Sequence, residues 1–480
     1  MAVNTVHSRR GAVIFDVLYG FIPITEWEEK IINSPFFQRL RWIKQLGFAN
    51  YIFPGAEHNR FAHAIGVMHS MHQMVKALGL AVPDHELHDP RSKSEAALLH
   101  KSLRIAALLH DIGTFPFSHA IEFAYIRHGN DKRRNPKHKK DLPNSHEHLG
   151  SFIIKNTNYE GGLTRVLESY GLDVLFISKI IKGESPYVIA NQLMHSDLDA
   201  DRMDYLLRDA YYTGIKYGQF DREYILANLV TFGSGKSDMA FGVRENATYA
   251  VEDFLIARFS WYSQVIKNQG SAKFDIMSSH IAKAFLETDS IHQFHDLLQM
   301  IEERDERFFW WNDVYFINRA QELRYKKSIR DPRVSELTEM LLYRRAPKTL
   351  HHPLFEHRIM SPGEEKERHK RVERVRQLVQ ECQGVLEKHG TGREWLLADI
   401  PERDVVFTTG LHRLNKKRTT SNLYLERDPV KVVSKDGKPS LLVERENTLM
   451  KILSGYTNFV PSVYANDQAV ALLKAKKIIN

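Results

Sequence analysis

The chain of 480 residues has a single cysteine, Cys382, and no long uninterrupted apolar run. One cysteine excludes an intramolecular disulfide framework and a cysteine-based zinc site. Because a membrane-spanning helix needs roughly 18 or more consecutive apolar residues, no segment is expected to cross a membrane. The first ten residues also lack the apolar core of a secretion signal. These absences predict a soluble, cytoplasmic protein.

The composition is that of a globular protein with a basic balance. Hydrophobic residues make up 43% of the chain and charged residues 26%, and the net charge is +8. At about 150 residues per domain, the length predicts two or three units. The positive charge fits nucleic-acid binding or the handling of polyanionic small molecules. Part of it lies in the stretch 127–140, which is expected to be an exposed loop, with a phosphate or nucleic-acid contact as the alternative.

Helical periodicity dominates most of the chain after a short extended segment at 12–20. Helices are expected over 61–80, 94–110 and 197–211, from 248 past 258, within 293–324 and over 363–388. The aromatic run 308–311 is interpreted as core or lobe-interface packing rather than a base-stacking surface. From about residue 404 the pattern changes to strands and hairpins, with a turn at Asp436-Gly437. The sequence therefore predicts a mainly α fold with a small mixed α/β tail.

Three polar clusters interrupt the helical packing, at 59–63, 110–119 and 197–205. A single histidine beside an aspartate is more often a satisfied core residue than a metal ligand. Several such residues in similar settings favour a metal site. Two imidazoles and two carboxylates suit a first-row divalent ion and leave positions open for water and a phosphate oxygen. The candidate ligands are His63, His110, Asp111 and Asp201.

The third cluster repeats polar residues at helical spacing. Asp201, Tyr205 and Asp209 are four residues apart, with Arg208 beside them, so they project to one side of a helix. A functional face and a merely solvated charged face both produce this pattern.

The order His, His-Asp, Asp along an α-helical chain resembles the HD superfamily of metal-dependent phosphohydrolases. The segments 37–47, 53–61, 116–119, 146–147 and 201–209 narrow the resemblance to deoxynucleoside triphosphate (dNTP) triphosphohydrolases. This family includes bacterial dNTPases and dGTPases and the vertebrate enzymes with a SAM and an HD domain. The resemblance covers roughly residues 12 to 290. It implies an HD catalytic domain over 1–290. The helical pattern and its change near residue 404 predict a helical C-terminal lobe over 291–400 and a small α/β segment over 401–480, whose regulatory or assembly role is inferred from position.

The resemblance also implies a reaction and its residues. One divalent metal per subunit, not distinguishable among Mn, Fe, Mg, Zn and Ni, would be held by the four candidate ligands, with Mg²⁺ on the triphosphate. Water would attack the α-phosphorus and expel the nucleoside 5′-oxygen, giving a deoxynucleoside and tripolyphosphate. His119, backed by Glu122 and His146, would protonate the leaving oxygen. The implied substrate contacts are Arg60, Arg202 and Arg258 to the triphosphate, and Gln45, Tyr205 and Asp209 to the sugar.

Several positions depart from the family pattern. Many relatives carry a histidine three residues after the HD aspartate, where this chain has Thr114, which cannot carry a proton near neutral pH. The vertebrate enzyme binds a regulatory nucleotide between subunits, and of the matching positions Gln38 and Arg41 are retained in this chain. The other matching positions carry residues that cannot make the same contacts, namely Ala12, Asn33, Gln264, Asn268 and Gln269. We therefore expect a homo-oligomer, a tetramer by resemblance, that responds to a different effector or to none.

Two other functions remain open at the level of sequence. One is an HD phosphodiesterase or nuclease that acts on a signalling nucleotide or a nucleic-acid end and uses the stretch 127–140 as a contact surface. The other is a regulatory protein that binds nucleotides without efficient turnover, for which Thr114 is the supporting feature. A dNTPase could serve nucleotide homeostasis or defence against phage, and the sequence does not choose between these roles.

Overall fold

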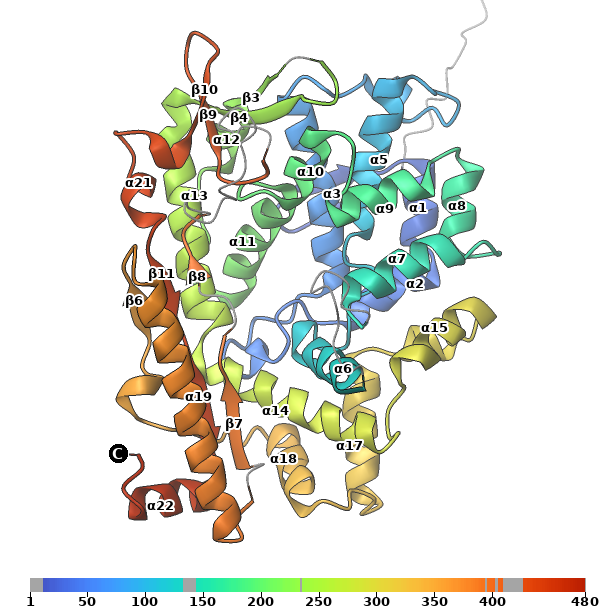
Figure 1. The fold of residues 1–480 in the computed structure, drawn as a ribbon. Helices are drawn as coiled ribbons and strands as arrows, with labels where there is room; N and C mark the ends of the chain where they lie inside the picture. The colour runs from blue at the N-terminus through green and yellow to red at the C-terminus, as the bar shows by residue number, and fades with distance from the viewer. Residues whose placement is uncertain are drawn as a thin grey trace, which may run out of the picture.

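The computed structural model describes residues 12–132, 144–233, 235–392, 395–401, 405–408 and 426–479. The fold is mainly helical with a few small sheets, as the sequence predicted (Figure 1). The helices of the N-terminal part are α1 Glu26–Ile32, α2 Pro35–Gln38, α3 Arg60–Ala77, α4 Asp84–Leu87, α5 Glu95–Leu109, α6 His119–Lys132, α7 His146–Asn156, α8 Leu163–Ser169, α9 Val174–Lys182, α10 Val188–His195, α11 Ala200–Thr213, α12 Arg222–Ala227, α13 Thr248–Trp261 and α14 Gln269–Glu287. The later helices are α15 Phe294–Glu303, α16 Arg307–Trp310, α17 Asp313–Tyr325, α18 Pro332–Leu342, α19 Glu365–Lys388, α21 Met450–Leu453 and α22 Asp467–Ala475.

Three capped helices form the centre of the N-terminal part. The side chain of Asn59 caps α3, that of Ser94 caps α5 and that of Asp199 caps α11, each by accepting a backbone N–H of the first turn. Helix α3 packs against both α5 and α11. Helix α5 ends at Leu109, so His110 is its C-cap residue. The observed helices confirm the predicted ones to within a few residues.

The predicted helical region 293–324 is divided into α15, α16 and α17. Asn312 starts the last of them by accepting the N–H of Tyr315. Phe308 and Trp311 are each only 1% exposed, so core packing is confirmed for these two rings. The prediction is wrong for Trp310, which is 61% exposed, because α16 is a short helix with one face toward solvent.

Small sheets connect the tail to earlier parts of the chain. Strand β9 (Lys431–Val433) forms the expected hairpin with β10 (Pro439–Leu441) and pairs in parallel with β4 (Ala240–Arg244), which pairs with β3 (Leu229–Phe232). Strand β12 (Ser462–Ala465) lies between β5 (Lys348–Thr349) and β7 (Leu396–Asp399), and β11 (Thr457–Phe459) lies between β6 (Arg358–Met360) and β8 (Val405–Val406). The tail therefore shares a sheet with residues that precede α13.

At the N-terminal end, the expected extended segment is a two-stranded hairpin of β1 (Val13–Asp16) and β2 (Gly20–Pro23). The basic stretch 127–140 begins inside α6, and its residues 133–140 lie outside the described part of the chain. The expected strand residues 423–425 also lie outside it. Among the described helices, none is long and apolar enough to cross a membrane.

Candidate metal centre and active site

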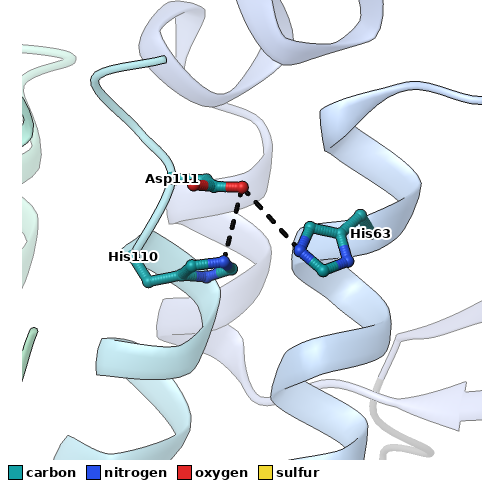
Figure 2. Close-up of side chains that lie close together, drawn as sticks. All are labelled: His63, His110 and Asp111. Carbon is teal, nitrogen blue, oxygen red and sulfur yellow. Dashed lines mark ion pairs between the residues drawn. The ribbon is translucent and has the colours of Figure 1, made fainter. Parts of the chain in front are cut away.

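The four predicted metal ligands meet where α5 ends beside the first turns of α3 and α11. His63 Nε2 lies 3.7 Å from Asp111 Oδ2 and 3.0 Å from Asp201 Oδ1. His110 Nε2 lies 3.4 Å from Asp111 Oδ2 and 3.7 Å from Asp201 Oδ1. Figure 2 shows the Asp111 carboxylate directed between the two imidazoles. Residues almost 140 positions apart in the sequence thus form one cluster of two nitrogen and two oxygen donors.

The second ring nitrogen of each histidine is already committed. Asp204 Oδ2 lies 2.8 Å from His63 Nδ1, and the carbonyl oxygen of Ala107 lies 2.8 Å from His110 Nδ1. Because both partners are acceptors, each Nδ1 carries a proton, and Nε2 is the ring nitrogen that can bind a cation once its own proton has left. This donor set could hold a divalent metal ion, and nitrogen and carboxylate donors together suit a first-row metal.

The charges of the cluster also favour a cation. Burial alone would lower the pKa of His63, but hydrogen bonds to Asp201 and Asp204 outweigh it and raise the pKa to about 10. Burial would raise the pKa of Asp111, but the charges of Arg60 and His110 hold it well below its usual range. In the protein without metal, a proton on an imidazole therefore partly neutralises carboxylates that a metal ion would neutralise instead.

Asp204, Arg208 and Asp16 form a buried series of ionic contacts that begins at Nδ1 of His63. Arg208 donates from Nε to Asp204 Oδ2 and from Nη2 to Asp204 Oδ1, both at 2.9 Å, and from Nη1 to Asp16 Oδ2 at 2.9 Å. Gly66 leaves the space for this pair, because an added Cβ would lie 1.9 Å from Asp204 Oδ1. The sequence reasoning assigned no role to Asp204 or Asp16. The four-residue spacing of Asp204 and Arg208 on one helix was the available signal.

The three predicted catalytic residues form a second cluster. Glu122 receives His119 Nδ1 at Oε2 and His146 Nδ1 at Oε1, each at 2.7 Å. Burial would raise the pKa of Glu122, but the two histidines hold it far below its usual range. Burial would lower the pKa of His146, but Glu122 raises it to about 9. The side chain of His119 is 58% exposed, so its Nε2 can reach a bound molecule.

Arg60 lies between the two clusters. Its Nη1 is 2.5 Å from Asp111 Oδ2, and its Nε donates to Ser118 Oγ at 3.0 Å. Arg60 is buried. Its guanidinium group therefore links a metal-ligand candidate, Asp111, to Ser118, the residue before His119.

The other two predicted phosphate-binding arginines are paired with carboxylates that the sequence reasoning did not single out. Arg202 contacts Asp199, the N-cap residue of α11. Arg258 donates from Nη1 to Asp197 Oδ1 at 2.7 Å and from Nη2 to the Phe407 carbonyl at 2.8 Å. These guanidinium groups therefore lie near the site but are not free of protein partners.

Residues 407 and 408, which lie in the C-terminal tail, contact the ion pair of Asp197 and Arg258. The Thr408 hydroxyl donates to Asp197 Oδ2 at 2.5 Å, and the Asp197 N–H donates to Asp428 Oδ1 at 2.5 Å. The Phe407 ring stacks on Phe259 with ring centroids 3.9 Å apart. Residues far beyond the predicted catalytic domain thus contact its candidate arginines.

The predicted sugar contacts leave three buried polar atoms unsatisfied. The Tyr205 hydroxyl, Gln45 Oε1 and Asp209 Oδ2 have no hydrogen-bond partner among the described residues, whereas Asp209 Oδ1 accepts from His58 at 2.7 Å. The Tyr205 ring lies against Trp261, with centroids 4.7 Å apart. Gln45 and His119 line a cavity of about 160 Å³ whose other walls are mainly apolar. Unpartnered polar atoms are expected where a ligand supplies the missing bond.

The remaining predicted positions lie away from this cluster or are internally satisfied. Arg41 Nε donates to Gln38 Oε1 at 2.8 Å, and its guanidinium lies 3.5 Å from the centre of the Phe61 ring. The Thr114 hydroxyl donates to the Asp111 carbonyl at 2.8 Å. Thr114 is 3% exposed, so it completes the turn after the metal-ligand pair instead of facing a substrate.

Comparison with known proteins agrees with this geometry. Residues 60–209 match the HD domain. The chain is 36% identical over 257 residues to the uncharacterized protein YwfO of Bacillus subtilis, covering 53% of this chain and 51% of that protein. It is 29% identical over 309 residues to the human deoxynucleoside triphosphate triphosphohydrolase SAMHD1, covering 59% of this chain and 46% of the human protein. The chain thus spans about half the length of these curated relatives.

Solved structures share the fold over nearly the whole chain. A phosphohydrolase from Bacteroides thetaiotaomicron superposes with a TM-score of 0.64 at 21% identity, covering 95% of this chain and 100% of that one. A hypothetical protein from Aquifex aeolicus superposes with a TM-score of 0.65 at 25% identity, covering 96% of this chain and 99% of that one.

The HD match contains all four metal-ligand candidates, so the chain carries an HD domain at residues 60–209. The chain is also similar to the SAMHD1 proteins of Homo sapiens, Bos taurus and Dictyostelium discoideum, which are named deoxynucleoside triphosphate triphosphohydrolases.

Proposed function

We propose that the protein is a metal-dependent phosphohydrolase that cleaves dNTPs to a deoxynucleoside and tripolyphosphate. The observation that carries this proposal is the pairing of two units. A four-donor cluster of two imidazoles and two carboxylates lies beside a His–Glu–His unit, and Arg60 contacts the first cluster and Ser118, the residue before His119. Such an arrangement would bind a metal cation, place the positive charge of Arg60 next to a phosphate group and provide a histidine as proton donor. Phosphoester hydrolysis requires these three components.

His63, His110, Asp111 and Asp201 would hold the divalent ion. When bound, the ion would supply Lewis-acid polarisation of a phosphate oxygen and activation of water at neutral pH. These four side chains also fix the position of the reacting phosphate relative to the His–Glu–His unit.

His119 is the proposed donor of the proton to the leaving 5′-oxygen. Glu122 accepts the Nδ1–H of His119, so only the imidazolium form of His119 carries an Nε2–H that can be transferred, and the Glu122 carboxylate orients that ring. His146 binds the other oxygen of Glu122 and remains positively charged at neutral pH, because its pKa lies at about 9. In this arrangement Glu122 orients two histidines, and the exposed one acts on the substrate.

The arginines supply the charge that a triphosphate requires. Arg202 and Arg258 are paired with Asp199 and Asp197 in the structure, and a triphosphate would compete with these carboxylates for the guanidinium groups. Arginine suits this role because its planar fork can bond two phosphate oxygens at once.

The leaving nucleoside would lie beside His119, where a cavity of about 160 Å³ can receive part of it. The cavity adjoins Ser118, which Arg60 links to Asp111, so it lies one side-chain layer from the metal cluster. Its mostly apolar walls fit a planar base, and the unpartnered Gln45 Oε1 can accept a sugar hydroxyl.

Product analysis tests this function. Purified protein is incubated with each dNTP, alone and in mixtures, with Mn²⁺ or Mg²⁺, and products are resolved by ion-exchange chromatography. We expect tripolyphosphate and a deoxynucleoside. Pyrophosphate, or nucleotides released from DNA, would contradict the proposal and favour a phosphodiesterase or nuclease.

A pair of histidine variants tests the assigned site. His110→Ala is expected to abolish metal binding and turnover together, because it removes one of the two nitrogen donors. His295→Ala is the matched control, since its side chain is 77% exposed and lies on α15. Metal retained by His110→Ala, measured by elemental analysis, would remove the assignment.

We further propose a homo-oligomer with a nucleotide effector at its interfaces. Exposed apolar side chains support it: Phe15, Phe21 and Trp42 are all more than half exposed, and Trp42 follows Arg41. Light scattering after size exclusion, with and without dNTPs, tests this assembly, which would be refuted by a monomer under every condition. The activity would lower the dNTP pool, which could serve nucleotide homeostasis or defence against phage.

A further inference from the structure

Asp313, the first residue of α17, binds two separate loops with one carboxylate. Its Oδ1 accepts the N–H of Phe117 at 2.6 Å, and its Oδ2 accepts the N–H of Lys44 at 2.9 Å. The residue is only 6% exposed. It lies outside the HD match of residues 60–209, in the lobe that follows α14. A residue of the C-terminal lobe is thus in direct contact with both loops.

Each tethered residue immediately precedes part of the candidate site. Lys44 precedes Gln45, and Phe117 precedes Ser118 and His119. The two loops also contact each other, since the Ser118 hydroxyl donates to the Lys44 carbonyl at 2.7 Å. The tethers therefore act on two polar residues that line the cavity beside His119, namely Gln45 and His119.

The loop that contains Phe117 and Ser118 has a backbone conformation that must be held by contacts with its surroundings. Phe117 and Ser118 have φ angles of +51° and +56°, which non-glycine residues rarely adopt. Consecutive residues in this region persist only when the surroundings enforce the conformation. The Asp313 bond to the Phe117 N–H is one such restraint. Stacking of the Phe117 ring on Phe48, with centroids 4.0 Å apart, is another.

We propose that Asp313 is a positioning residue that fixes the spacing of Gln45 and His119 across the leaving-group cavity. This inference rests on the proposed dNTP hydrolysis for its catalytic meaning, but the tethers themselves do not depend on that function. The carboxylate acts through the two loops and does not touch the substrate.

Only a carboxylate can satisfy both loops. An asparagine at this position offers one carbonyl oxygen and one NH₂ group, so one of the two backbone N–H groups would lose its acceptor in a buried place. Asp313→Asn keeps the shape of the side chain and removes one tether. Asn312→Ala is the matched control, because Asn312 caps the same helix at the Tyr315 N–H and holds neither loop.

Hydrogen exchange tests the tethers without reference to activity. In Asp313→Asn, the amide of Phe117 or of Lys44 is expected to exchange about tenfold faster or more, measured by mass spectrometry on peptides covering 113–119 and 43–47. Asn312→Ala is expected to lower the melting temperature while both amides stay protected. Unchanged protection of both amides in Asp313→Asn overturns the inference, whether or not the protein hydrolyses dNTPs.

Kinetics tests the positioning role. Asp313→Asn is expected to lower kcat by about a hundredfold with metal content unchanged, because small misplacements of reacting groups have effects of that size. Asn312→Ala is expected to keep most of the wild-type kcat. Equal kcat in Asp313→Asn and wild type, or loss of metal together with activity, overturns the role. A wild-type protein inactive on every dNTP refutes the proposed function instead, and the exchange experiment then decides the inference.

The pH profile adds a signature that a purely structural role would not show. Burial raises the pKa of Asp313 to about 7, although the N–H groups of Phe117 and Lys44 and the charges of Lys44 and Arg39 oppose the shift. Protonation below that pH makes the wild type resemble the asparagine variant. The ratio of wild-type to Asp313→Asn activity is expected to shrink as pH falls from about 8.5 to 6. A ratio constant over this range shows that Asp313 stays ionised, and the exchange and kinetic measurements then decide its positioning role.

Discussion

Replacing Asp204 by asparagine is the perturbation that tests the metal centre most directly without removing a ligand. The carboxylate accepts His63 Nδ1 at 2.8 Å and two guanidinium nitrogens of Arg208 at 2.9 Å. Asparagine keeps the shape and one acceptor oxygen but loses the charge that orients the imidazole. Loss of such a partner weakens metal binding by about 10- to 100-fold, which corresponds to about 1.4 to 2.7 kcal/mol.

We expect Asp204→Asn to lower the free energy of unfolding by less than the complete loss of a buried ion pair would. Removing one partner of such a pair typically costs about 3 to 5 kcal/mol. Arg208 keeps its contact with Asp16 at 2.9 Å, so its charge is not left alone in Asp204→Asn. Denaturant unfolding of the metal-free protein measures this part separately from metal affinity.

The assay is a competition titration of metal-free protein with Mn²⁺ or Co²⁺ against a chromophoric chelator. Asp16→Asn provides a graded comparison, since Asp16 contacts Arg208 and not His63, and we expect its affinity to fall less than that of Asp204→Asn. Gly66→Ala approaches the same pair sterically, with a Cβ 1.9 Å from Asp204 Oδ1, and should also weaken binding. Gly384→Ala is its helical control, because no atom lies within 4 Å of the added Cβ.

The reasoning is refuted if Asp204→Asn binds metal as tightly as the wild type while its fold is intact. It is also refuted if Asp16→Asn and Asp204→Asn lose the same affinity, because the effect would then come from Arg208 and not from the orientation of His63.

Three further predictions concern the rest of the site. Contact between Glu122 and His146 lowers the pKa of Glu122 and raises that of His146 to about 9. It should therefore stabilise the fold fully only between pH 4.5, the ordinary pKa of glutamate, and pH 6.5, the ordinary pKa of histidine. This contribution should fall as pH drops below that window or rises toward 9, and thermal melts of Glu122→Gln against wild type should show the difference vanishing at both extremes. Thr114→His should lower the melting temperature and give no gain in dNTP turnover, because overpacking a buried site costs about 1 to 3 kcal/mol; higher turnover would refute the packing role of Thr114. Arg258→Met should raise KM for dNTPs about tenfold or more with metal content unchanged, measured by steady-state kinetics, and an unchanged KM would show that Asp197 keeps Arg258 from the substrate.

The sequence predicted that the four candidate metal ligands lie close together, because they stand at helix ends and match the HD pattern. His110 follows an apolar helix directly, and His63 and Asp201 lie in the first turns of helices with Asn and Asp caps. Helix boundaries therefore fixed which residues share one end of the bundle. The mainly α fold followed from the same periodicity.

Contacts between residues distant in sequence could not be predicted in this way. Helix α11 was expected to have an apolar side and a polar side, yet Asp204, Arg208 and Asp209 are all buried. Each has an ionic partner from elsewhere, namely His63, Asp16 and His58. Periodicity distinguishes apolar from polar faces, and a polar face that is buried by pairing looks the same as a solvated one.

The candidate active site is larger than the HD match that contains its metal ligands. Asp313 from α17 holds the loop before His119, Arg39 bonds the carbonyls of Ile112 and Thr114, and Thr408 bonds Asp197. These contacts fix the turn after the ligand pair and the carboxylate partner of Arg258. A fragment limited to residues 60–209 would keep all four ligands and lose those restraints. Such a fragment should therefore be a poor catalyst even where it binds metal, because hydrolysis depends on placing the proton donor and the phosphate clamp as well as the ion.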